Sequence, residues 1–132
     1  MANVKLGTKA VGSIVKIKVN GASKDFIVVQ QGNPNTSTYD SSCAGTWLLM
    51  KDIYTKYTFG NNNSYKDSSI HTYLNGTFYN LIDSNIRAAI KQVKIPYQNG
   101  TGSGGSLATG SNGLSTKVFL LSGYEVGWTT SD

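Results

Sequence analysis

A chain of 132 residues, with 39% hydrophobic residues and a net charge of +5, is long enough for one globular domain and too short for two. It has no run of the roughly 18 to 20 apolar residues that a membrane span needs, and no apolar secretory signal at its N-terminus. We therefore expect no membrane span, and synthesis in a cytosol. The positive excess lies in residues 1–66, with eight lysines and three aspartates. These lysines are scattered and include no arginine cluster, so nucleic acid is not an expected partner.

Alternating side chains predict a strand near the N-terminus. It follows an expected arm of residues 1–12 and begins a single domain of residues 13–132. In residues 13–19 aliphatic side chains alternate with Lys16 and Lys18, which is typical of a strand with one buried face. The two lysines would lie on the exposed face.

Turn residues and an apolar run predict the next two strands. The sequence NGASKD, residues 20–25, is rich in turn formers, and the strand that returns from it is expected to start at Phe26. The apolar run Trp47–Met50 predicts a short buried strand. Residues 32–45 and 58–67 are polar and are expected to form long loops.

Helices are predicted after the second loop. Asp67 or Ser68 can cap the first of them, and the Asn75–Gly76 pair is expected to end it, because glycine readily takes the left-handed conformation found at helix C-termini. A second short turn follows. Asp83 is then expected to cap a third helix of two to three turns over residues 84–93.

The C-terminal third predicts one strand limited by Pro96, a glycine-rich loop, a last strand over residues 116–122, and a helical turn at Gly123–Val126. The loop Gly100–Ser106 resembles a phosphate cradle in composition only. A P-loop needs Gly-Lys-Ser/Thr between a strand and a helix, and no lysine follows until Lys117. The expected fold is α+β, a small, mostly antiparallel sheet with two or three short helices.

Residues that could carry chemistry are sparse. The single histidine, His71, precedes Tyr73 by two residues, so on a helix it would lie off the apolar face, exposed or at its rim. The single cysteine, Cys43, shows no signature of a nucleophile and is expected to be a small buried or half-buried residue. One histidine, one cysteine and seven scattered carboxylates do not supply a zinc site. We therefore expect no catalytic residue, no cofactor and no metal.

Recognition is the remaining kind of function, and Asn, Ser, Thr, Gly and Tyr are abundant, as in many recognition proteins. Sugar recognition needs exposed aromatic rings beside convergent polar groups. The candidate contacts are Tyr57, Asn61, Asn62, Asn63 and Tyr65 in the second loop, with Lys16 and Lys18 on the first strand. The residues expected to pack the core are Trp47, Tyr73, Leu74, Phe78, Ile86 and Phe119.

Two motifs carry a resemblance to a known family. They are YLNGxFYN at Tyr73–Asn80 and KVFLLSxxEV at Lys117–Val126. With the segments around them, nearly the whole chain resembles an uncharacterised domain family of Gram-positive gut bacteria and their phages. The family has no assigned activity, so the resemblance implies no catalytic residues. Its members continue further, which implies that the second half of the family domain is absent here. It also implies a partial C-type-lectin-like fold.

The function implied by this resemblance is structural. We expect a non-enzymatic phage virion protein, made in the host cytoplasm and located in the phage particle. There it would decorate the capsid or belong to the tail, in an oligomeric assembly with other virion proteins. The alternative is a carbohydrate- or cell-surface-binding module for host attachment, with a bacterial surface glycan as its ligand.

Overall fold

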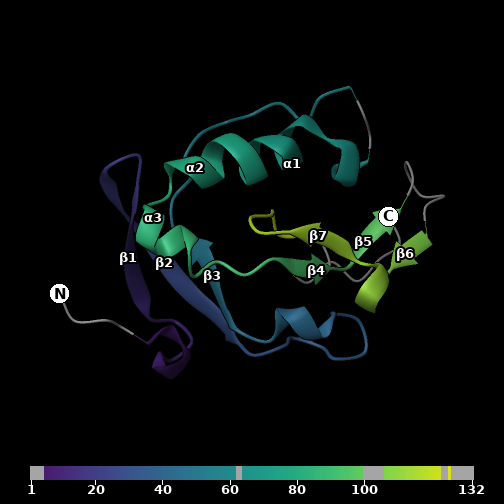
Figure 1. The fold of residues 1–132 in the computed structure, drawn as a ribbon, viewed down its shortest axis with the longest axis horizontal. Helices are drawn as coiled ribbons and strands as arrows, with labels where there is room; N and C mark the ends of the chain where they lie inside the picture. Colours follow the sequence, from purple (N-terminus) through teal and green to yellow (C-terminus); the bar gives the residue numbers. More distant parts are fainter. Residues whose placement is uncertain (1–4, 62–63, 100–105, 123–124, 126–132) are drawn as a thin grey trace.

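The computed structural model describes residues 5–61, 64–99, 106–122 and 125 of the chain (Figure 1). The strands and α-helices among them are β1 (Ile14–Val19), β2 (Ala22–Gln31), β3 (Thr46–Met50), α1 (Ser69–Tyr73), α2 (Tyr79–Leu81), α3 (Ser84–Arg87), β4 (Val93–Ile95), β5 (Tyr97–Asn99), β6 (Ser106–Ala108) and β7 (Leu114–Thr116). They form small antiparallel sheets with a few helices, which confirms the predicted α+β class. In this part of the chain no helix is long and apolar enough to cross a membrane.

The largest sheet has the strand order β1-β2-β3, and both pairs are antiparallel. The predicted alternation of β1 is confirmed, since Ile17 and Val19 are buried while its lysines are exposed. The prediction that the returning strand starts at Phe26 is wrong, because β2 begins at Ala22. Asn20 (φ 52°) and Gly21 (φ 77°) make a tight two-residue turn, which leaves the next residues free to pair with β1.

Strand β3 lies where the apolar run predicts it, but it is not fully buried. Leu48 and Met50 pack toward the core, whereas Leu49 between them is 36% exposed. β3 is an edge strand of this sheet, and Leu49 is its exposed residue, whereas Trp47 is half-buried and packs edge-on against Tyr39.

The main helix does not end at Gly76, so that prediction is wrong. α1, a π-helical turn (Leu74–Phe78) and α2 follow one another without a break, giving one helix from Ser69 to Leu81. Ser68 caps it as expected, because its hydroxyl accepts a hydrogen bond from the His71 N–H at 3.2 Å. Gly76 is not in the left-handed region.

The Asn75 side chain ties the helix to the C-terminal segment. Its Oδ1 accepts hydrogen bonds from Lys117 N (2.8 Å), Val118 N (3.2 Å) and the Thr116 hydroxyl (3.1 Å). Its Nδ2 donates to the carbonyls of Val118 (2.8 Å) and His71 (3.1 Å). The strand predicted over residues 116–122 is therefore wrong. The last described strand is Leu114–Thr116, and the N–H groups after it bond to Asn75 rather than to a strand.

α3 is also shorter than predicted, with four residues in place of two to three turns, and the Asp83 side chain makes no capping hydrogen bond. The chain before it is tied to β1 instead. Asn20 N–H donates to Leu81 O at 2.7 Å, Asp83 N–H donates to Lys18 O at 3.0 Å, and Val19 forms a β-bridge with Ile82. These bonds fix the exit of the main helix on the edge of the sheet.

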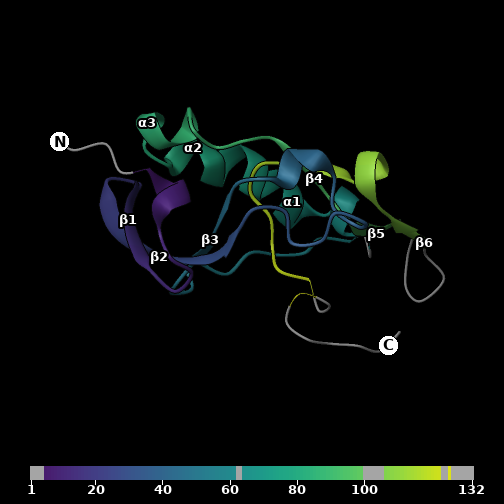
Figure 2. The same ribbon diagram turned by 90° about the horizontal axis from the view of Figure 1, so that it is seen from below.

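The two smaller sheets, β4-β7 and β5-β6, lie away from the β1-β2 hairpin (Figure 2). Pro96 ends β4, but a second strand, β5, follows it in a different sheet, where one strand was predicted. The helical turn predicted at Gly123–Val126 and the glycine-rich loop Gly100–Ser106 lie largely outside the described residues.

Two apolar clusters hold these parts together. Ile17, Val19, Phe78 and Ile82 form the first, between the large sheet and the main helix. Tyr39, Cys43, Ile95 and Leu114 form the second, beside the small sheets. All six predicted core residues contribute. Phe78 is buried, Tyr73, Leu74 and Ile86 pack on the first cluster, and Trp47 and Phe119 pack on the second.

Candidate functional site

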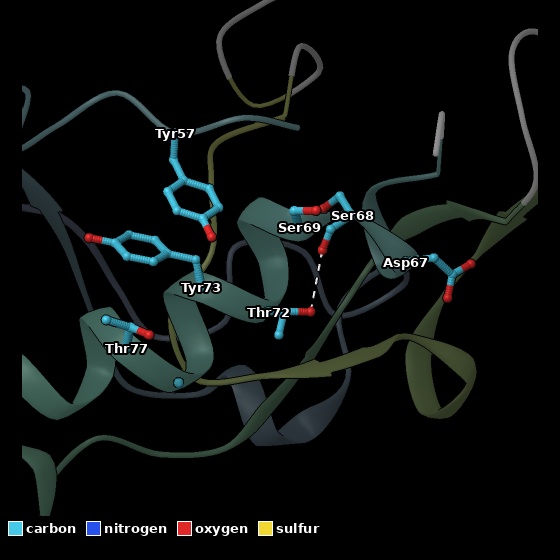
Figure 3. A pocket seen from close by; sticks show the side chains of 8 residues that line it. Tyr57, Asp67, Ser68, Ser69, Thr72, Tyr73 and Thr77 are labelled. Carbon is cyan, nitrogen blue, oxygen red and sulfur yellow. Dashed lines mark hydrogen bonds between the residues drawn. The ribbon is translucent and has the colours of Figure 1, made fainter. Parts of the chain in front are cut away.

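A shallow groove of about 380 Å³ runs along the exposed side of the main helix (Figure 3). Its lining comes from the helix, from the turn before it and from the loop that crosses it. The lining residues are Tyr57, Asp67, Ser68, Ser69, Thr72, Tyr73, Gly76 and Thr77. The tyrosines stand at one end of the groove and Asp67 at the other, with the serines and Thr72 between them.

Helical spacing explains why these side chains meet. Ser69, Thr72, Tyr73, Gly76 and Thr77 follow one another at intervals that place them on one side of a helix. Leu74 and Phe78 of the same helix face the core instead. A Cβ at Gly76 would meet nothing within 4 Å, so the glycine leaves the floor of the groove open.

Tyr57 forms a fixed wall of the groove. Its ring stacks on Tyr73, with centroids 4.2 Å apart and planes 15° from parallel, yet it remains 46% exposed. The loop is pinned nearby, because Ser69 N–H donates to Phe59 O at 2.9 Å. Gly60 permits this close approach. Its φ is +96°, and a Cβ there would lie 2.5 Å from the Ser69 hydroxyl.

Some polar groups of the groove form hydrogen bonds within the fold, and others are exposed to a ligand. Ser68 is fully buried, and its hydroxyl is used within the fold, where it caps the helix and donates to Tyr65 O at 2.6 Å. Thr72 makes one long hydrogen bond, 3.4 Å, to the Ser68 carbonyl. The exposed polar side chains along the groove are those of Asp67, Ser69, Thr72 and Thr77.

His71 lies at the rim of the apolar face, as predicted, and does not line the groove. It is half-buried, meets the Tyr65 ring edge-on at 5.2 Å, and its Nδ1 lies 3.4 Å from Asn75 Nδ2. Burial lowers the pKa of His71, although the nearby Asp67 carboxylate opposes this shift. The imidazole therefore packs against its neighbours, and its charged form is disfavoured.

Cys43 is buried, as predicted, with 2% of its surface exposed. Its thiol donates to the Lys94 carbonyl at 3.2 Å, and burial raises the pKa of the thiol. A thiol with a raised pKa is a poor nucleophile. Among the described contacts none joins it to His71, and no three His, Cys, Asp or Glu side chains of the described residues gather closely enough to hold a metal ion.

The contact residues predicted from the sequence do not form one site. Tyr57 lines the groove. Asn61 directly follows Gly60 and is exposed, and Asn62 and Asn63 lie outside the described residues. Tyr65 is half-buried, and its hydroxyl accepts a hydrogen bond from Leu120 N at 3.2 Å, so it packs rather than projects. Lys16 and Lys18 lie on the sheet face that points away from the helix.

Ser69, Thr72, Gly76 and Thr77 are the groove residues that sequence reasoning missed. Their helical spacing is the signal that could have identified them. It was hidden by the prediction that the helix ends at Gly76, which would place Thr77 on a separate turn.

Comparison with known proteins gives a family and nothing further. The family described as a domain of unknown function (DUF6273) matches residues 44–132. No curated protein and no solved structure matches the chain. The matched segment includes every residue that lines the groove.

Proposed function

As the chain belongs to the DUF6273 family of domains of unknown function, we propose that it is a non-enzymatic binding domain whose helix-side groove takes a carbohydrate. The observation that carries this proposal is the pinned Tyr57–Tyr73 stack at one end of a row of exposed hydroxyl groups.

The lining matches the two kinds of surface on a sugar. A pyranose ring has a face of C–H groups, which packs well on an aromatic ring, and an edge of hydroxyls, which needs hydrogen-bond partners. Tyr57 supplies the ring, and Ser69, Thr72 and Asp67 supply donors and acceptors along the groove. Because Gly60 and the Ser69 N–H already hold the Tyr57 loop in place, the loop loses little conformational entropy when a ligand binds.

The shape and charge of the groove support binding without catalysis. The groove is open, whereas catalytic sites usually exclude water around the reacting atoms. Its lining holds one carboxylate, that of Asp67, whereas most glycoside hydrolases use a pair. An open groove suits a segment of a polymer, such as a glycan on a bacterial surface.

A structural role in a phage particle is the second proposal. In this role the domain would be made in the host cytoplasm and would decorate the capsid or belong to the tail, in contact with other virion proteins. The observation that favours it is a row of exposed aliphatic side chains on the large sheet, including Ile14 and Leu49. Mass spectrometry of purified particles tests this role, and absence of the chain from intact particles would contradict it.

Binding of the full chain to an array of bacterial surface oligosaccharides tests the groove. We expect Tyr57→Ala to weaken binding by about tenfold or more, since it removes the exposed ring. Gly76→Leu should do the same by filling the open floor of the groove.

The matched control is Phe59→Ala. Phe59 is a ring of similar exposure, 42%, two residues further on, but it does not line the groove. The proposal fails if no oligosaccharide is retained, or if the Tyr57 and Gly76 variants bind as strongly as the Phe59 variant.

A further inference from the structure

The outer face of the large sheet carries an apolar row. The main helix covers the other face, where Ile17, Val19 and Phe26 point. On the outer face the pairing register places Ile14 opposite Ile27, and Ile27 opposite Leu49, so the three side chains form one row across all three strands. Ile14 is 48% exposed and Leu49 36%. Ile27 between them is half-buried.

A charged row runs beside the apolar one. Lys16 is paired with Asp25 across β1 and β2, and its Nζ lies 2.7 Å from Asp25 Oδ1. Lys51 N–H donates to the Asp25 carbonyl at 2.9 Å, which continues the row onto the end of β3. Lys16 and the charge of Lys51 both lower the pKa of Asp25. Lys18 follows on β1, exposed and without a carboxylate partner among the described ion pairs.

The charge of this face favours some binding partners over others. The charged row and the shallow hollow beside it, which Lys24, Asp25 and Asp52 border, together hold four lysines and two aspartates, so this side of the face is positive although Asp25 neutralises part of it. A second copy of the chain would bring two positive faces together, which is unfavourable. An anionic membrane would meet the Asp25 carboxylate and half-covered aliphatic side chains, without a tryptophan or tyrosine in either row to insert at the interface. A protein surface with aliphatic side chains flanked by carboxylates complements both rows.

We propose that this outer face, centred on Ile14, Ile27 and Leu49, is a docking surface for an acidic, aliphatic protein segment. Its aliphatic side chains would cover the apolar row, and its carboxylates would reach Lys18 and Lys51 at the border. The surface lies on the far side of the sheet from the helix that carries the groove. This inference goes beyond the proposed carbohydrate function and does not depend on it.

Nuclear magnetic resonance titration of the full chain tests the docking surface. The probe is a synthetic peptide of alternating leucine and glutamate, compared with a leucine–lysine peptide and a serine–glutamate peptide. We expect the leucine–glutamate peptide alone to shift the amide signals of β1, β2 and β3, with affinity that falls as NaCl rises from about 0.05 to about 0.5 M. We expect Leu49→Ser and Lys18→Glu each to weaken binding by about tenfold.

Leu107→Ser is the matched control, because Leu107 is a 63% exposed leucine on β6, in a different sheet, and its loss should leave binding unchanged. The inference is wrong if the leucine–glutamate peptide does not bind, or if both surface variants bind it as the wild type does. It is also wrong if phosphatidylserine vesicles shift these signals and the peptide does not, or if the free chain already dimerises through this face. Tyr57→Ala should leave peptide binding intact, which separates this result from that of the carbohydrate test.

Discussion

Replacing Asn75 with alanine should destabilise the domain more than any other exchange of a polar side chain on the main helix. The amide forms four hydrogen bonds with residues 116–118 and a fifth with the His71 carbonyl. Alanine leaves the N–H groups of Lys117 and Val118 without the acceptor that the fold gives them. Neutral hydrogen bonds contribute about 0.5 to 1.5 kcal/mol each. Because this site is half-buried and water can replace part of the loss, we expect a cost of about 2 to 4 kcal/mol.

Thermal unfolding followed by circular dichroism measures this cost. For a domain of this size, about 3 kcal/mol corresponds to a fall of roughly 10 °C in Tm. The matched control is Asn80→Ala on the same helix. Asn80 is exposed and accepts one hydrogen bond, from Arg87 at 3.2 Å, so its loss should change the free energy of unfolding by about 0.5 kcal/mol or less. Equal shifts for the two variants would refute the assignment of Asn75 as the clamp between the helix and the C-terminal segment.

Three further predictions concern His71, Cys43 and Gly60. Burial lowers the pKa of His71 in the fold, so the unfolded chain binds the proton more readily, and stability should fall as the pH drops through about 6.5. Urea unfolding at about pH 7.5 and 5.5 measures this effect. Between these two pH values the free energy of unfolding should fall less for His71→Gln than for the wild type. Ellman's reagent should leave Cys43 unmodified in the native protein and react once it is unfolded; rapid native reaction would contradict its burial. Gly60→Ala should cost about 1 to 3 kcal/mol, because its φ is +96° and the new methyl would meet the Ser69 hydroxyl; an unchanged Tm would contradict the strain.

Strands β1 to β3 could be predicted from the sequence because their signals are local. The alternation in residues 14–19 and the apolar run Trp47–Met50 each specify an element without reference to the rest of the chain. Even there, the length of the hairpin turn was missed, since a left-handed Asn20–Gly21 pair is enough to reverse the chain. Alternation predicts which face of a strand is apolar, but it does not predict whether a second layer covers the other face.

The end of the main helix and the last strand could not be predicted, because one long-range contact decides both. Asn-Gly is a common helix end, yet here Asn75 bonds to residues more than forty positions later. The same bonds occupy the N–H groups of Lys117 and Val118, so an apolar run that looks like a strand is not available for pairing. The groove depends on this outcome, since Gly76 and Thr77 line it only if the helix continues.

The family match begins after the first strands of the folded unit, and both proposed surfaces depend on those strands. The match begins at residue 44, after the β1-β2 hairpin. However, Ile17 and Val19 of that hairpin share a cluster with Phe78 and Ile82, and Val19 bridges Ile82 directly. The hairpin therefore supplies the inner face that holds the groove-bearing helix, and its outer face carries most of the proposed docking surface. A ligand in the groove and a partner on the sheet would accordingly contact opposite sides of one core.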